Sequence, residues 1–362
     1  MPTIYDFDGF EDYDTSGIGR EHVRVETPAN ASIVSGGRKG GSRLKCVSGG
    51  AMPDVRLCRV LPVVVHTLCV GAYVELTSLA APSIASHYFY DFRDSGSSQL
   101  GVGYFTDGTL FVRLAGTFFG SAANDWDFWG GGGAFSFGTN LGLSAAGTIQ
   151  ANVGFHLQVK VTIHATAGAV EVKVNGVTVI GPLTNICTQF ATDEVTNLVY
   201  GLIGGGTVYF DDMWFSDDFL GDCIIWSHFP RTPDGDHLDG VPLGAGDHYV
   251  EVNEKPEPDD DTSYVTVTGA GERESYYVDA LVETGATILA IETVIDAKKT
   301  DVGEATISDH IRQDSTDADG TVKGLSVAYG RIKQVYQTDP VRGGAWTESG
   351  FNAAQYGVKK VT

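Results

Sequence analysis

The fold is decided by the stretch Phe155-His-Leu-Gln-Val-Lys-Val-Thr-Ile-His164, in which apolar and polar residues alternate. Such alternation is typical of a strand with one buried face. A second alternating run, residues 170–174, is followed by Asn175-Gly176 and by a third run, residues 177–180. Asn-Gly between β-branched runs indicates a tight hairpin, because both residues tolerate the positive φ of a type I′ turn. Successive antiparallel hairpins with one apolar face predict one sheet of a β-sandwich.

Two segments rich in aromatic and acidic residues lie before and after these hairpins in the sequence. They are Tyr5-Asp-Phe-Asp-Gly-Phe-Glu11 and Val208-Tyr-Phe-Asp-Asp-Met-Trp-Phe-Ser-Asp217. With the hairpins between them, these segments resemble concanavalin A-like (laminin-G-like) jelly rolls, in particular those of bacteriophage virion proteins. In that pattern the opening segment pairs near the closing Asp-Asp strand. Thr338-Asp-Pro340 and residues 352–358 (Asn-Ala-Ala-Gln-Tyr-Gly-Val) also resemble phage structural proteins. The resemblance implies a virion structural protein with a jelly-roll domain.

The 362 residues include 24 basic and 46 acidic side chains, for a net charge of −22. Such a surface repels nucleic-acid phosphate and anionic lipid, so we expect neither nucleic-acid binding nor membrane insertion. The N-terminal residues 1–6 lack the cationic segment of a signal peptide. The most apolar run, residues 60–74, is interrupted by Pro62 and His66 and is too short to span a bilayer.

Cysteine usage is low and irregular. The five cysteines form no C-x-x-C pair, and an odd number leaves at least one free thiol in a monomer. They stand mostly in apolar, strand-like runs, so we expect small buried hydrophobes in a protein that folds in a reducing cytoplasm.

Composition shifts divide the chain into three parts. Short strand-like runs with turn signals between them, about 8–12 residues apart, predict a β-sandwich over residues 1–217, and the resemblance implies that this sandwich is a jelly roll. Residues 218–258 are rich in turn formers and read as a connector. Residues 259–362 are again β-like and predict a smaller C-terminal β-sandwich, with one short helix within residues 347–356. The predicted fold class is therefore all-β.

An aromatic segment precedes the central hairpins. Trp126, Phe128 and Trp129 stand beside four glycines, residues 130–133, and do not fit a regular strand. One interpretation is a loop that stacks on sugar rings, which makes these three residues the candidate carbohydrate-binding site. The other is that the aromatic side chains plug the sandwich or lie in a subunit interface.

Two acidic clusters place carboxylates at alternate or near-alternate positions beside glycine: residues 234–239 and residues 314–320. Calcium requires six to eight oxygen ligands, and the second cluster resembles the start of a calcium loop without its distal glutamate. Asp314, Asp317 and Asp319 are the candidate Ca²⁺ ligands. The competing interpretation is that both clusters are solvated turns and that the chain takes no cofactor.

Catalytic patterns are not found in the sequence. Glu-x-Asp-x-x-Glu, Gly-x-Ser-x-Gly and His-Glu-x-x-His do not occur. Asp211 and Asp212 are adjacent, so a regular strand would direct them to opposite faces, unlike the paired carboxylates of a glycosidase. We therefore expect a protein that is not an enzyme.

The sequence favours a structural protein of the phage virion, tail-associated as a fibre, tail-tip or minor tail protein, with contact to a host-surface glycan. Its expected partners are other virion proteins and further copies of the chain in a homo-oligomer. A capsid decoration or head-fibre protein is the first alternative. A carbohydrate-binding adhesin or degraded glycanase is the second.

Overall fold

The computed structural model describes residues 1–12, 14–15, 18, 24–26, 28–48, 55–79, 86–94, 97–114, 139–189, 192–203, 206–244, 246–255, 258–281 and 283–362. Strands make up 53% of the structure and helices 5%, so the predicted all-β class is confirmed. The chain divides into two compact units, residues 1–225 and 226–362. Each unit is described on its own below.

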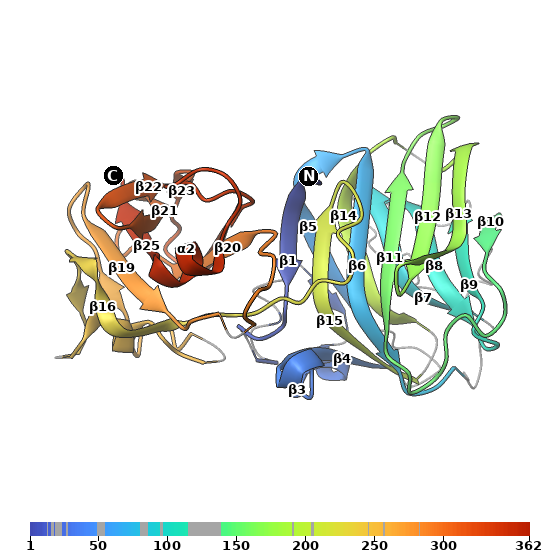
Figure 1. Ribbon diagram of the computed structural model, residues 1–362, viewed down its shortest axis with the longest axis horizontal. Coiled ribbons are helices and arrows are strands. Elements are labelled where there is room, and N and C mark those ends of the chain that lie inside the picture. Colours follow the sequence, from blue (N-terminus) through green and yellow to red (C-terminus); the bar gives the residue numbers. More distant parts are fainter. Residues whose placement is uncertain are drawn as a thin grey trace. The chain divides into compact units, whose positions relative to one another are not determined.

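Unit 1 contains two large antiparallel sheets. In spatial order, sheet A consists of β13 (Val177–Ile186), β12 (Gly168–Val174), β11 (Phe155–Thr162), β6 (Thr67–Leu76), β15 (Gly206–Ser216), β4 (Ser42–Ser48) and β3 (Ala31–Ser35), with β1 (Ile4–Asp8) also paired to β15. Sheet B consists of β10 (Asn140–Leu143), β9 (Leu110–Leu114), β8 (Ser97–Phe105), β7 (Ser86–Asp94), β14 (Val195–Ile203), β5 (Val55–Val65) and β2 (Arg24–Glu26). The 3₁₀ turns η1 (Pro28–Asn30) and η2 (Arg38–Gly40) flank β3. In Figure 1, β7, β8 and β9 form a layer behind β11 and β12.

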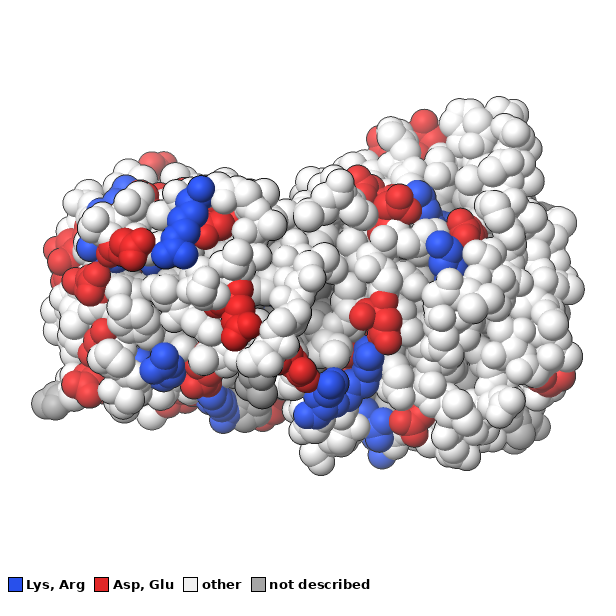
Figure 2. Space-filling view, in the orientation of Figure 1, with Lys and Arg blue, Asp and Glu red and all other residues white. Residues whose placement is uncertain are grey.

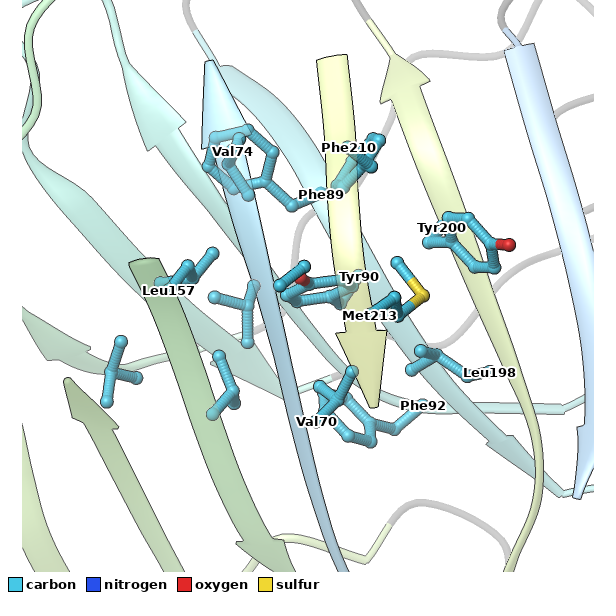
Figure 3. Packing of buried hydrophobic residues seen from close by; sticks show 14 of the residues in the cluster. Val70, Val74, Phe89, Tyr90, Phe92, Leu157, Leu198, Tyr200, Phe210 and Met213 are labelled. Atoms are coloured by element: carbon cyan, nitrogen blue, oxygen red, sulfur yellow. The ribbon is translucent and has the colours of Figure 1, made fainter. Parts of the chain in front are cut away.

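The core of unit 1 fills the space between these two sheets. Strand alternation supplies it, as in β12, where Val170, Val172 and Val174 are buried and the residues between them are partly exposed. Figure 3 shows side chains of the two sheets pointing toward each other, with Val70, Val74 and Leu157 from sheet A opposite residues of sheet B. Among them the Phe89 ring of sheet B lies 6.5 Å from the Phe210 ring of sheet A, edge to face. This is the sandwich core that the alternating runs predict.

Two specific sequence expectations for unit 1 are confirmed. The Asn175-Gly176 turn joins β12 to β13, and both residues have positive φ, 49° and 79°. The opening strand β1 pairs with the closing strand β15, in a register that places Phe7 opposite Trp214 and Asp8 opposite Met213.

Unit 2 is built on a six-stranded antiparallel sheet, sheet C. Its strands, in order, are β16 (Pro230–Leu238), β19 (Arg273–Val278), β25 (Gln355–Lys360), β21 (Thr306–Gln313) and β22 (Thr316–Asp319), with β23 (Lys323–Gly324) also paired to β21. Two further pairs are β17 (Val241–Pro242) with β18 (Val265–Thr266) and β20 (Ile291–Ala297) with β24 (Gly330–Tyr336). The remaining elements are η3 (His248–Glu251) and the helix α2 (Glu348–Ala353).

One face of sheet C carries the core of unit 2. Buried Ile311 of β21 packs with Trp346 and Ala354, and Tyr336 of β24 joins them from the β20–β24 pair. Helix α2 lies within the predicted range 347–356, and the Thr347 side chain caps it by accepting a hydrogen bond from the backbone N–H of Gly350. The short helix that the sequence predicts is therefore present.

The boundary between the units differs from the expected three-part division. Unit 1 extends past Asp217 to Ile225, and the rest of the expected connector belongs to unit 2, where residues 230–238 form β16. The separate connector predicted over residues 218–258 is therefore not seen. Residues 218–225 form no strand, so their turn-rich composition resembles that of a connector. Side-chain contacts nevertheless attach them to unit 1.

All five cysteines are free thiols. Cys46, Cys58 and Cys69 are buried as expected, whereas Cys187 is exposed.

Acidic and basic side chains lie in mixed groups on the face shown in Figure 2, separated by wide uncharged areas. In the described part of the chain, no helix is long and apolar enough to cross a membrane.

Candidate functional site

A polar cluster lies on the face of sheet C that points away from the core of unit 2. Alternation along β21 buries Ile311 in the core, so His310 and Arg312 project from the opposite face. The antiparallel register places Asp319 of β22 opposite His310, and Asp317 opposite Arg312. Directly opposed residues share a face, so these four side chains lie together.

A bulge in β16 brings His237 into the same cluster. The pairing with β19 shifts register so that Asp234 lies opposite Tyr276 but Leu238 lies opposite Glu274. The extra residues of β16 therefore leave the strand line. Gly235 lies directly on the sheet, because a Cβ atom there would lie 2.3 Å from the Ser275 carbonyl oxygen. The backbone N–H of His237 then donates to the Ser275 hydroxyl at 3.1 Å.

The central strands of sheet C accommodate this bulge with small residues. Ser275 of β19 and Gly357 of β25 lie opposite each other, and Ser275 Oγ donates to Gln355 Oε1 at 2.8 Å. Gln355 Oε1 in turn accepts from the backbone N–H of Asp236 at 2.7 Å. The bulge is thus hydrogen-bonded over β19 and β25, and His237 reaches β21 and β22.

The three side chains that meet there are His237, His310 and Asp317. His237 Nε2 lies 3.3 Å from each carboxylate oxygen of Asp317, and His310 Nε2 lies 3.5 Å from Asp317 Oδ1. One ligand atom from each of the three residues lies within 4.8 Å of the other two. Among the described residues, this is the group of His, Cys, Asp and Glu side chains whose geometry suits a metal ion.

His310 is the most buried member of the cluster, with a side chain that is 0% exposed. Its Nδ1 lies 2.9 Å from Asp319 Oδ1, and its Nε2 makes no hydrogen bond. Burial lowers the pKa of the His310 imidazole, and the bond to Asp319 opposes this effect only in part. A neutral ring that donates from Nδ1 leaves the Nε2 lone pair directed toward Asp317.

Basic residues surround the carboxylates. Arg312 donates through Nη1 to Asp317 Oδ1 at 2.6 Å, and Arg273 and Lys359 both bond to Asp319. Partial burial raises the pKa of the Asp319 carboxyl, but the bonds from Lys359, His310 and Arg273 outweigh it and leave the pKa at about 2. The pKa of Asp317 is also lowered in spite of burial, chiefly by the bond from Arg312. Both carboxylates are therefore ionised at neutral pH.

The structure does not bring the three predicted calcium ligands together as one set. Asp314 lies in the turn between β21 and β22, with a φ of 56°, and pairs with Arg342 at 3.3 Å. Asp317 and Asp319 do share a face, but basic residues and histidine nitrogens occupy the space around them. The donors that a calcium site requires are oxygens, so a calcium loop at residues 314–320 is not what the geometry supports.

The sequence pattern does not predict a contribution from His310 or Arg312, but the two acidic segments that it does indicate meet in the structure. Residues 234–239 supply His237 and residues 314–320 supply Asp317, so both segments belong to one cluster rather than to two separate turns. The available signal was the alternation Ser308-Asp-His-Ile-Arg312 next to Thr316-Asp-Ala-Asp319, which directs alternate polar residues to one face of a hairpin.

The predicted aromatic sugar-binding residues Trp126, Phe128 and Trp129 lie outside the described residues. The proposed stacking on sugar rings, and the alternative of a plug or subunit interface, therefore both remain predictions.

In unit 1 the adjacent carboxylates Asp211 and Asp212 lie at an irregularity of β15. Its pairing with β6 shifts register between Asp211 and Trp214, and Asp212 has a φ of 49°. Asp211 Oδ2 accepts from the backbone N–H of Arg38 at 2.6 Å, and Asp212 Oδ2 accepts from the Arg38 guanidinium at 3.1 Å. The expectation that they point to opposite faces is wrong, because the bulge interrupts strand alternation and both contact Arg38.

These carboxylates are buried and hard to ionise. Burial raises the pKa of Asp211 to about 7, and the neighbouring Asp212 adds to the increase. Burial likewise raises the pKa of Asp212 to about 6, against the bonds from Ile225 and Arg38. Their oxygens hold the Arg38 turn and the backbone of Ile225, whose N–H lies 2.7 Å from Asp212 Oδ1. The two carboxylates therefore hold the Arg38 turn and the backbone at Ile225 against β15 by hydrogen bonds.

Residues 218–225 lie across the outer face of sheet A. Asp218 pairs with Lys160 of β11 at 2.9 Å, and the backbone N–H of Gly221 donates to Gln158 Oε1 at 3.1 Å. Beneath this segment, His156 of β11 is buried and neither of its ring nitrogens has a hydrogen-bond partner. The chain thus covers a face that in an open sandwich would be free.

No protein-family model and no curated protein matches this chain. Among solved structures it is similar to the cellulose-induced protein Cip1, with 13% identity over 53% of this chain and 88% of the other and a TM-score of 0.38. Alginate lyase Aly36B is 13% identical over 59% of this chain and 95% of its own, with a TM-score of 0.39. A protein of unknown function with a galectin-like fold from Bacillus subtilis is 10% identical over 54% of this chain and 88% of its own, with a TM-score of 0.33. At these values the likeness concerns the β-sandwich alone, and no ligand or activity is carried over.

Proposed function

We propose that this chain is a non-enzymatic structural protein of a bacteriophage particle, associated with the tail as a fibre, tail-tip or minor tail component. The observation that supports the proposal is the pairing of β1 with β15. The resemblance to phage jelly rolls implies that the opening segment with Asp-Gly-Phe-Glu pairs near the closing strand with Asp-Asp. The pairing joins residues 4–8 to residues 213–216 within one sheet, so unit 1 is closed by its own ends.

The environment of Asp211 and Asp212 supports the non-enzymatic part of the proposal. Both carboxylates are buried and bonded to the backbone of the Arg38 turn or of Ile225, so they serve to fasten segments of unit 1. A glycosidase needs two carboxylates that flank a substrate bond in an accessible cleft. Residues 218–225 further cover the outer face of sheet A.

In this proposal the protein resides in the virion, and its partners are other virion proteins and further copies of the chain in a homo-oligomer. Most soluble oligomers are homo-oligomers with closed symmetry. Light scattering of the purified protein, with and without calcium, measures this directly. A stable trimer or larger ring supports an assembly interface encoded in the chain, whereas a monomer in both conditions argues against it.

Immunogold electron microscopy tests the location. Antibodies raised against the recombinant chain are applied to purified particles from the strain that carries its coding sequence. Gold on the tail supports the proposal, and gold on the head favours the alternative of a capsid decoration or head-fibre protein. Particles without gold, beside a control antibody that labels the major capsid protein, contradict a virion role.

The remaining alternative is a carbohydrate-binding adhesin or a degraded glycanase that contacts a host-surface glycan. A glycan array probed with the labelled protein distinguishes it from a scaffold, with a Trp126→Ala, Trp129→Ala variant as the control. Binding that this double variant loses supports an adhesin. Release of reducing ends or unsaturated sugars from host polysaccharide would instead contradict the non-enzymatic proposal.

A further inference from the structure

We propose that His237, His310 and Asp317 form a binding site for one Zn²⁺-class divalent transition-metal ion on sheet C. The inference is independent of the proposed role in a phage particle. A tetrahedral zinc ion with bonds of about 2.0–2.1 Å keeps its ligand atoms about 3.3 Å apart. Asp317 Oδ2 lies 3.3 Å from His237 Nε2 and Asp317 Oδ1 lies 3.5 Å from His310 Nε2, both close to that spacing, and one ligand atom from each of the three residues lies within 4.8 Å of the other two.

The environment of His310 is the second, independent observation. Its side chain is fully buried and aimed into the cluster, yet its Nε2 has no hydrogen-bond partner. A buried polar atom without a partner is costly, and a metal ion would satisfy it. Its Nδ1 faces Asp319 Oδ1 at 2.9 Å, the arrangement of carboxylate, histidine and metal in which an outer carboxylate fixes the ring.

The donor set selects the class of metal. Two imidazole nitrogens and one carboxylate suit zinc, cobalt, nickel or copper, whereas calcium and magnesium prefer oxygen donors only. Three protein ligands leave a fourth position open to water or another ligand. The ligands come from three strands, β16, β21 and β22, so a bound ion would cross-link the bulge of β16 to the hairpin of β21 and β22.

Arg312 shares the site with the metal. Its Nη1 bonds to Asp317 Oδ1 at 2.6 Å and lies 3.3 Å from His237 Nε2, while its Nε bonds to Asp236 at 2.9 Å. Asp317 has a second oxygen, Oδ2, which lies 3.3 Å from His237 Nε2. We infer that the guanidinium remains on Oδ1 and that Oδ2 binds the metal, which requires Oδ2 to move toward His310 Nε2, because the 3.5 Å distance of that nitrogen is to Oδ1.

Isothermal titration calorimetry of the full, tag-free chain with ZnCl₂, after EDTA treatment and buffer exchange, tests the proposal. One equivalent of Zn²⁺ is expected per chain, with no corresponding binding of CaCl₂. Co²⁺ should give the visible absorption of a tetrahedral ion without a thiolate charge-transfer band. His310→Ala and Asp317→Asn should each weaken Zn²⁺ binding by about 100-fold or more, and Asp319→Asn by about 10–100-fold.

The controls separate this site from adventitious binding. His66→Ala removes an exposed histidine, and Cys187→Ser removes the exposed thiol; neither should change the affinity. His237 lies on the bulge with a side chain that is 24% exposed, so His237→Ala should fold even if His310→Ala does not. Binding of Zn²⁺ that persists in His237→Ala and Asp317→Asn, or that Cys187→Ser abolishes, would overturn the proposal, as would the lack of any binding in the wild type.

Discussion

His237 Nε2 lies 3.3 Å from both carboxylate oxygens of Asp317, although the two residues are 80 positions apart in the chain. Neither strand neighbours the other in sheet C, because β19, β25 and β21 lie between β16 and β22. The bulge of β16 closes that gap. Bringing together two residues so far apart in the chain costs conformational entropy of the loop between them. The hydrogen bonds from the bulge to Ser275 and Gln355 help to offset this cost.

The first prediction concerns the cation beside the proposed ligands. Arg312→Gln should strengthen Zn²⁺ binding by about tenfold, because a positive charge near the metal costs about 1 kcal/mol per unit of charge even in water. Calorimetry with ZnCl₂ measures the change. Lys323→Gln, a charge removal at an exposed residue of β23, is the matched control and should leave the affinity unchanged. Weaker binding by Arg312→Gln would show that the guanidinium positions Asp317 rather than competes with the metal.

The cluster was only partly predictable from sequence. Asp317 stood out because acidic residues alternate near a glycine, and this pattern suggested calcium. His310 carried no such signal, since a single histidine in an alternating strand is ordinary. The place of His310 in the cluster depends on which strands pair and on the bulge at Gly235. The local alternation of apolar and polar residues predicts neither of them.

The second prediction concerns a close approach in sheet A. A Cβ atom on Gly71 of β6 would lie 2.2 Å from two ring carbons of Trp214, which lies opposite it on β15. Gly71→Ala should therefore lower the free energy of unfolding by about 1–3 kcal/mol through overpacking. Calorimetric or chemical unfolding of the full chain measures the loss. Gly324→Ala, where a Cβ atom meets nothing within 4 Å, should be near neutral. An equal effect of the two variants would contradict the packing argument.

The third prediction concerns the ion pairs that attach β1 to sheet B. Arg59 of β5 lies 2.6 Å from Asp6 and 3.5 Å from Asp8, and all three side chains are buried. Arg59→Ala removes the buried guanidinium that both carboxylates contact and should cost about 3–5 kcal/mol of unfolding free energy. Lys160→Ala removes an exposed pair with Asp218 and should cost less than about 1 kcal/mol. A small loss in Arg59→Ala would mean that water replaces the guanidinium.

The fold was more predictable than the site, for a physical reason. The hairpin at Asn175-Gly176 and the alternation of β12 are local, so their signals lie within a few residues. The end of unit 1 is not local. Residues 218–225 have no strand period, and they belong to unit 1 through single contacts such as Asp218 with Lys160 and Ile225 with Asp212. Composition alone therefore placed the boundary at Asp217.

The last prediction is a pH dependence of unit 1. The folded-state pKa values of Asp211 and Asp212, about 7 and about 6, lie above the ordinary value of 3.8. A raised carboxyl pKa contributes stability that is full at low pH and lost as the pH rises through 6 and 7. His156 acts in the opposite direction, because burial lowers its pKa from 6.5 to about 4. Its contribution is present above pH 6.5 and is lost as the pH falls toward 4.

The two effects oppose each other most strongly between pH 4 and pH 6.5, and the carboxylates dominate from pH 6.5 to pH 8. In that window unit 1 should lose about 0.5–1 kcal/mol, which corresponds to a fall in Tm of about 1–4 °C. Scanning calorimetry of the full chain measures it, and the transition that Arg59→Ala shifts identifies unit 1. Asp211→Asn cannot ionise, so its Tm should vary less with pH even if it is lower at every pH. A Tm that falls equally in wild type and Asp211→Asn would assign the pH dependence to other groups.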